Sequence, residues 1–132
     1  MGVSLEPLRI LIVDDHEDSA EMLSMLLGGK GHTTRMALDG ATALDVAAAF
    51  LPHVGLLDLS LPGMSGYELA ERLRAMPGLT QIHLVAVTGH GGEVHRAKTR
   101  AAGFHQHLLK PVDLQMVDDV LASVRQALDQ GS

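Results

Sequence analysis

The sequence contains no cysteine, and aromatic residues make up only 2% of its 132 positions. Without cysteine the chain has neither a disulfide framework nor a thiolate zinc site, which agrees with a reducing compartment. With so few aromatic rings, the core has to be built from Leu, Val, Ile, Ala and Met. Hydrophobic residues make up 46% of the chain, which is enough apolar surface to fold, and the length predicts a single domain.

The chain also lacks an excess of positive charge. Its formal net charge is −6, which disfavours binding to nucleic acid or to an anionic membrane. No apolar run approaches the ~20 residues that cross a bilayer, and the first residues do not resemble a signal peptide. We therefore expect a cytoplasmic protein that contacts neither a membrane nor nucleic acid directly.

Short apolar runs alternate with helix-like segments along the chain. The runs at 8–13, 54–57 and 82–87, and weaker ones at 32–38 and 105–109, predict five strands. Strands that alternate with helices form a parallel sheet with helices on both faces. The sequence therefore predicts an α/β fold, a single doubly wound (βα)5 flavodoxin-like domain with strand order 2-1-3-4-5.

The segments between the strands predict five helices, because their apolar residues recur at helical spacing. We expect the domain to span residues 8–129, with flexible ends at 1–7 and 130–132. For the second and fourth helices, the residues expected to face the sheet are Ala41, Leu44 and Ala48, and Val94, Ala97 and Ala101.

Polar residues end four of the predicted strands. Asp14 and Asp15 follow the first strand, Asp58 the third, Thr88 the fourth and Lys110 the fifth. In an open parallel sheet the binding crevice lies beyond the carboxyl ends of the strands. We therefore expect three carboxylates, a hydroxyl and an ammonium to converge there.

This set of residue types favours phosphoryl chemistry. Carboxylates held close together repel one another, and a hard divalent cation that prefers oxygen ligands relieves the repulsion. Mg²⁺ binds one or two carboxylates and completes its shell with water and phosphate oxygens. A carboxylate can attack phosphorus to form an aspartyl phosphate, and Lys110 and Thr88 could then bind phosphoryl oxygens.

Four motifs occur in order, each at a predicted strand end: IVDD at 12–15, LDLSLPGMSG at 57–66, VTG at 87–89 and LKP at 109–111. Any one of them alone is a weak signal. Together they resemble the receiver domain of bacterial response regulators in two-component systems, over roughly residues 8–128. The stretch 103–113 is similar to receivers attached to hybrid sensor kinases.

The resemblance implies a role for each matching residue. Asp58 would be the phosphoacceptor, Asp15 a direct ligand of Mg²⁺, and Asp14 an acidic partner acting partly through water. The main-chain carbonyl of Ser60 would be a further ligand, and Mn²⁺ could substitute for Mg²⁺. Lys110 would bind the phosphoryl group, with the bond to the following proline in the cis form that only X-Pro peptides adopt at modest cost.

The resemblance also implies a switch and partners. Thr88 would move toward the phosphoryl group, and His107 occupies the position where many receivers carry an aromatic switch residue. Ser60 and His90 lie where side chains tune the lifetime of the acyl phosphate. The protein would be a signalling switch rather than a turnover enzyme, phosphorylated by a sensor histidine kinase or a histidine phosphotransfer domain. A homodimer could form through the fourth helix, fifth strand and fifth helix.

Simpler explanations exist for several of these residues. Asp14 and Asp15 could cap the first helix, Asp58 could be a turn residue, and Lys110 could be an edge lysine that extends into solvent. Eight histidines raise the possibility of a transition-metal site, above all at His105 and His107. Such a site needs a third ligand, which the sequence does not display.

Two other function classes remain open. An aspartyl-phosphate hydrolase of the haloacid dehalogenase kind also places an aspartate at a strand end. It needs a second aspartate two residues later as general acid, where this chain has Ser60. A flavodoxin-like binding module is the other class, although an acidic crevice would repel a flavin phosphate.

Overall fold

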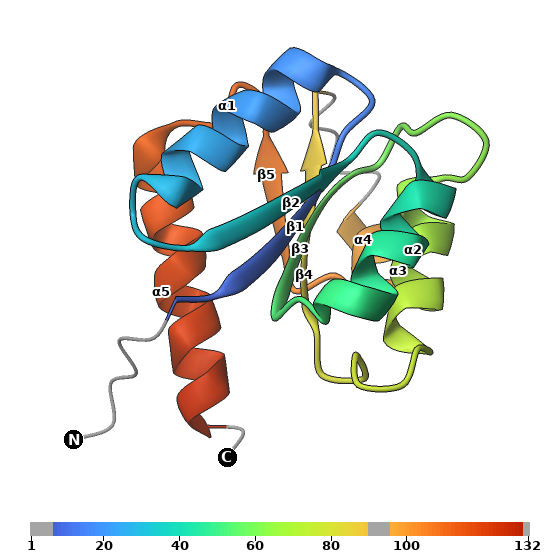
Figure 1. Cartoon of the computed structure of the whole chain (residues 1–132). Helices are drawn as coiled ribbons and strands as arrows, with labels where there is room; N and C mark the ends of the chain where they lie inside the picture. Colours follow the sequence, from blue (N-terminus) through green and yellow to red (C-terminus); the bar gives the residue numbers. More distant parts are fainter. Residues whose placement is uncertain (1–6, 90–95, 131–132) are drawn as a thin grey trace.

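Five parallel strands form one sheet in the order β2-β1-β3-β4-β5, as the sequence predicts (Figure 1). The computed structural model describes residues 7–89 and 96–130, so most of the predicted flexible ends lie outside the described residues. The strands are β1 (Arg9–Val13), β2 (Thr33–Ala37), β3 (Val54–Asp58), β4 (His83–Thr88) and β5 (Gln106–Leu109).

Helices cover both faces of the sheet. In Figure 1, α1 and α5 lie on one face, and α2, α3 and α4 lie on the other. Within the described residues, every helix is too short or too polar to serve as a transmembrane span. The helices are α1 (Glu17–Gly28), α2 (Gly40–Phe50), α3 (Gly66–Arg74), α4 (Arg96–Ala101) and α5 (Leu114–Gln130).

Successive residues of β1 enter two different cores. Ile10 and Ile12 pack with the residues of α1 and α5. Leu11 and Val13 pack with those of α2 and α3 on the opposite face. A strand that is buried on both sides has no polar face, which explains why the sequence shows a continuous apolar run here rather than an alternating one.

Four of the residues predicted to face the sheet in α2 and α4 are exposed in the structure, whereas Leu44 packs against the core as expected. In α2, Ala43 and Ala47 are buried whereas Ala41 and Ala48 are exposed, and Leu44 is half-buried. Nearly every residue of this helix is small or apolar, so several faces fit helical spacing equally well. Packing against the sheet, which spacing cannot detect, selects among them.

In α4 the residues expected to face the sheet, Ala97 and Ala101, are exposed. Thr99 in the helix and Ala102 directly after it are buried instead. The third expected residue, Val94, lies outside the described residues.

The carboxyl ends of the strands lie together at the top of Figure 1, and the amino ends lie at the bottom. β1 pairs with β3, and the chain leaves β1 toward α1 on one face of the sheet but leaves β3 toward α3 on the other face (Figure 1). This divergence is the topological switch point at which open α/β sheets bind their ligands.

Candidate functional site

An ammonium and two buried carboxylates meet at the carboxyl edge of the sheet. Lys110 Nζ lies 2.9 Å from Asp14 Oδ2 and 3.3 Å from Asp58 Oδ2. The carboxylates extend from the ends of β1 and β3, and only 3% and 7% of their side chains are exposed. Lys110 therefore faces the central strands from the end of β5 rather than extending into solvent.

Burial and charge shift the pKa values of these groups. Burial raises the pKa of Asp58 above its usual range, because a carboxylate is less stable away from water, and the nearby charge of Asp14 adds to this. The N–H of Ser60 and the ammonium of Lys110 oppose the rise without cancelling it. Burial disfavours the charged form of Lys110, but Asp14 and Asp58 outweigh this effect and raise its pKa.

The backbone around Asp58 is held by close contacts. Asp58 Oδ1 accepts a hydrogen bond of 2.8 Å from the Ser60 N–H. The Asp58 side chain therefore also stabilises the turn that follows β3. Gly66, the first residue of α3, packs directly on this segment. A Cβ at that glycine would lie 2.5 Å from the main-chain oxygen of Asp58 and 2.8 Å from Cα of Leu59. Only glycine permits this approach.

Asp15 and His16 complete an acidic group beside Asp14. Among the residues that the structure describes, one group of His, Asp and Glu side chains places a ligand atom from each member within 4.8 Å of all the others: Asp14, Asp15, His16 and Asp58. The N-cap residue of α1 is His16, so neither aspartate caps that helix. Instead, Asp14 Oδ1 accepts the His16 N–H at 2.9 Å.

Thr88 and Lys110 are joined through the backbone. Thr88 is buried at the end of β4, and its carbonyl accepts a hydrogen bond of 2.9 Å from the Lys110 N–H. The Lys110–Pro111 peptide bond is cis, as expected. The backbone thus places the hydroxyl-bearing residue and the ammonium-bearing residue on neighbouring strand ends.

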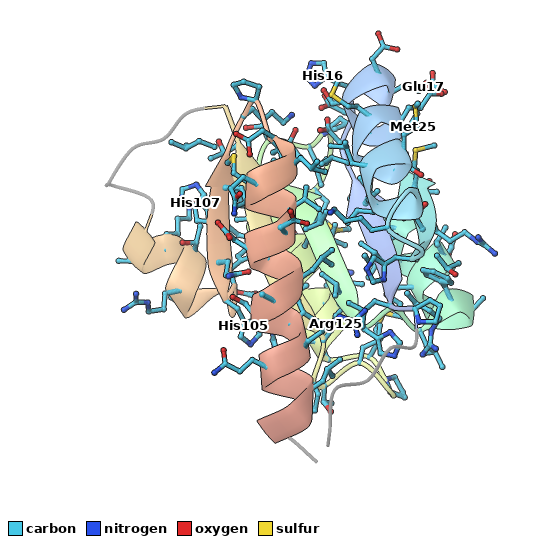
Figure 2. All side chains as sticks on the ribbon, turned by 90° about the vertical axis from the view of Figure 1, so that its left-hand side faces the viewer. His16, Glu17, Met25, His105, His107 and Arg125 are labelled. Carbon is cyan, nitrogen blue, oxygen red and sulfur yellow. The ribbon has the colours of Figure 1, made fainter. Side chains whose placement is uncertain are left out.

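Three other predicted residues lie around this site. Ser60 is exposed, directly beyond β3. His107 is half-buried in β5, where its register partner on β4 is Ala86 (Figure 2). His90 lies outside the described residues.

His105 contacts the backbone of β4 and the ring of a neighbouring histidine. Its Nδ1 accepts the Leu84 N–H at 3.2 Å, and its ring stacks on His83 with centroids 4.3 Å apart. Neither His105 nor His107 belongs to a group of three potential ligands within the described part of the chain. The transition-metal alternative therefore gains no third ligand there.

Sequence reasoning missed His16 as a neighbour of the acidic group. A signal was available, because the histidine follows the paired aspartates directly. It also missed that His32 and His53 accept hydrogen bonds from the N–H groups of Leu8 and Arg9, at 3.0 and 2.9 Å. These contacts join residues 24 and 44 positions apart, so local patterns do not reveal them.

A cleft of about 380 Å³ opens beside the site. It lies between α1 and the segment that follows β5, and its lining includes Asp14, Lys110, Pro111 and Met22. The Met22 side chain is mostly exposed, as is Met25 one turn further along α1 (Figure 2). An apolar surface therefore borders the polar crevice.

Comparison with known proteins identifies the family. The model of the response regulator receiver domain matches residues 10–122, which is most of the chain. The chain therefore belongs to the response regulator receiver domain family, whose members are signalling modules of two-component systems.

Individual relatives agree with this assignment. The chain is 36% identical over 105 residues to the response regulator PleD of Caulobacter vibrioides, covering 80% of this chain and 23% of PleD. The chain thus spans about a quarter of that relative's length.

Two solved structures have the same fold. One is a CheY-like response regulator receiver domain from Methylobacillus flagellatus, with a TM-score of 0.78 and 29% identity over 90% of this chain and 99% of the other. The other is the receiver domain of the sensor histidine kinase PA1611 from Pseudomonas aeruginosa, described with a magnesium ion coordinated in the active-site cleft. It has a TM-score of 0.82 and 22% identity over 91% of this chain and 98% of the other.

Proposed function

We propose that the domain, over residues 8–129, accepts a phosphoryl group on Asp58 in a reaction that depends on Mg²⁺. The observation that carries the proposal is the contact of Lys110 Nζ with both Asp14 and Asp58, two carboxylates buried at neighbouring strand ends. An acidic crevice that already holds a lysine ammonium can stabilise both a metal ion and a transferred phosphoryl group.

The donor set fits Mg²⁺. The ion would be held by Asp14, Asp15, Asp58 and the main-chain carbonyl of Ser60, all of them oxygen donors. When bound, it neutralises negative charge on the carboxylates and on phosphate oxygens. Burial raises the pKa of Asp58 in spite of the nearby Lys110 ammonium, and a bound cation would favour the charged form of this carboxylate. Mn²⁺ could take its place.

The donor would be a phosphohistidine on a sensor histidine kinase or a histidine phosphotransfer domain. A carboxylate oxygen of Asp58 forms the new bond to phosphorus while the bond from phosphorus to the histidine nitrogen breaks, and the imidazole leaves with the electron pair. Lys110 neutralises the transferred oxygens. The exposed methionines Met22 and Met25 beside the cleft offer an apolar surface on which such a partner could dock.

Phosphorylation would then shift a pre-existing conformational equilibrium through Thr88 and Lys110. The backbone hydrogen bond between these residues supports a joint movement. His107 on β5 would take the place of the aromatic switch residue, and Ser60 and His90 would tune the lifetime of the acyl phosphate. The surface of α4, β5 and α5 would carry the output, as a homodimer interface or as a contact with another domain.

We further propose that the domain works in the cytoplasm, makes no direct contact with nucleic acid and assists its own phosphorylation and dephosphorylation without acting on a separate substrate. The net charge of −6 supports the second of these points.

The test is intact-mass measurement after treatment with acetyl phosphate, with Mg²⁺ or with a chelator. Wild-type protein should gain the mass of one phosphoryl group only with Mg²⁺, and Asp58→Asn should gain none. Asp45→Asn is the matched control, because Asp45 is an exposed carboxylate on α2. Undiminished labelling of Asp58→Asn would place the acceptor elsewhere and overturn the proposal.

A further inference from the structure

The imidazole of His16 faces the acidic group. Its Nδ1 lies 3.1 Å from Asp15 Oδ1 and 3.4 Å from Asp14 Oδ1. Figure 2 shows His16 at the end of α1 that lies at the carboxyl edge of the sheet. With 71% of the side chain exposed, ions from solvent can reach the ring.

This position is set by the backbone and leaves the ring available. The His16 N–H donates to Asp14 Oδ1, which turns the chain back toward the acidic residues. His16 is the N-cap residue of α1, yet its side chain makes no capping hydrogen bond. The ring therefore lies against the carboxylates, although the usual use of a side chain at this position is to accept a helix N–H.

The spacing of the donor atoms suits a single ion. Ligands bound about 2.1 Å from a divalent ion are about 4.2 Å apart when they lie on opposite sides of it. The ligand atoms of Asp14, Asp15, His16 and Asp58 lie within 4.8 Å of one another, so small side-chain movements would bring them to that spacing.

We propose that His16 supplies a nitrogen ligand to this site and thereby raises its affinity for first-row transition ions relative to Mg²⁺. Imidazole nitrogen binds these ions well, whereas Mg²⁺ prefers oxygen ligands. The inference rests on the proposed function for the metal site itself and adds a selectivity that carboxylates and carbonyls alone would not give. The ions concerned are Mn²⁺ and, more strongly, the later ions of the series.

The direct test is pulsed electron paramagnetic resonance of Mn²⁺ bound to the whole chain. A nitrogen ligand produces a ¹⁴N modulation, which should be present in the wild type, disappear when excess Mg²⁺ displaces the ion, and be lost in His16→Gln. The control is His53→Asn, at the opposite edge of the sheet. The amide oxygen introduced by this substitution can still accept the hydrogen bond that the Arg9 N–H donates to His53 Nδ1. The ¹⁴N modulation should therefore remain.

Calorimetric titration with Mn²⁺ and with Mg²⁺ gives a second measure. His16→Gln should weaken Mn²⁺ binding about tenfold more than it weakens Mg²⁺ binding. Equal losses for both ions, or a wild-type Mn²⁺ complex without ¹⁴N modulation, would overturn the role of His16 while leaving the carboxylate site intact. If Mg²⁺ neither displaces Mn²⁺ nor supports phosphorylation, the proposed function fails together with the inference.

Discussion

The two edges of the sheet contain opposite chemistry. At the carboxyl edge, one ammonium contacts two buried carboxylates, and the pKa of Asp58 stays raised in spite of it. At the amino edge, the imidazoles of His32, His53 and His105 each accept one backbone N–H group. One edge holds a buried carboxylate whose charged form is disfavoured, whereas at the other edge neutral imidazoles satisfy backbone N–H groups. The difference separates a place for a ligand from a place that only stabilises the fold.

The amino edge depends on neutral histidines. An imidazole accepts a hydrogen bond at Nδ1 only while that nitrogen carries no proton. Burial lowers the pKa values of His32, His83 and His105, and nearby positive charge adds to the effect, with Arg74 acting on the stacked pair His83 and His105. The sheet is thus arranged to keep these rings uncharged.

The largest effect is expected from breaking the amino edge. His105→Ala removes the acceptor of the Leu84 N–H, which belongs to a fully buried residue, and also the ring that stacks on His83. The free energy of unfolding should fall by about 2 kcal/mol in urea denaturation, because an unsatisfied buried donor is costly. His105→Asn keeps an acceptor near the same place and should lose less. Equal losses in the two variants would show that the hydrogen bond contributes little.

A smaller effect of opposite sign is expected at the carboxyl edge. Asp58→Asn removes a carboxylate whose pKa is raised by burial, so the variant should unfold with a free energy about 1 kcal/mol higher than the wild type. The measurement needs a chelator, since a bound metal ion would offset the cost of the charge. A destabilised Asp58→Asn would mean that Lys110 compensates the carboxylate fully.

The smallest expected effect is the change in the free energy of unfolding with pH, which also distinguishes the two edges. His32, His83 and His105 have lowered pKa values in the fold, so the unfolded chain binds more protons below the unperturbed value of 6.5. Stability is then complete above that value and decreases as the pH falls through it. The urea midpoint should be lower at about pH 5.5 than at about pH 7.5, and the difference should shrink in the double variant His32→Asn, His105→Asn.

Asp58 gives the reverse dependence. Its pKa is raised above 3.8 in the fold, so its contribution is most favourable below that value and is lost as the pH rises through its folded pKa. If the free energy of unfolding is the same at about pH 5.5 and about pH 7.5, the proposed dependence of the amino edge on neutral histidine rings is contradicted.

The sequence predicts the carboxyl edge well, because that edge is built from strand ends. Apolar runs that terminate in Asp14, Asp58, Thr88 and Lys110 define both the strands and the residues beyond them. Once the strand order follows from alternation, the convergence of these residues is a matter of topology. Their chemical roles stay predictions until the variants are measured.

The amino edge and the helix faces could not be predicted in this way. His53 meets the Arg9 N–H only because β1 and β3 are neighbours, and nothing local to either residue reveals the contact. In α2, small apolar residues surround the helix axis, so spacing alone selected Ala41 and Ala48 where the fold buries Ala43 and Ala47. Both failures concern contacts that arise from packing between distant segments.

The hydrogen bonds of the amino edge also fix the tautomers of three rings. Because Nδ1 of His32, His53 and His105 accepts a hydrogen bond from a backbone N–H group, the ring hydrogen of each neutral imidazole resides on Nε2. Nitrogen chemical shifts distinguish the two tautomers, so these histidines are built-in spectroscopic reporters. They allow the integrity of the sheet to be followed, without any added label, while events at the opposite edge are studied.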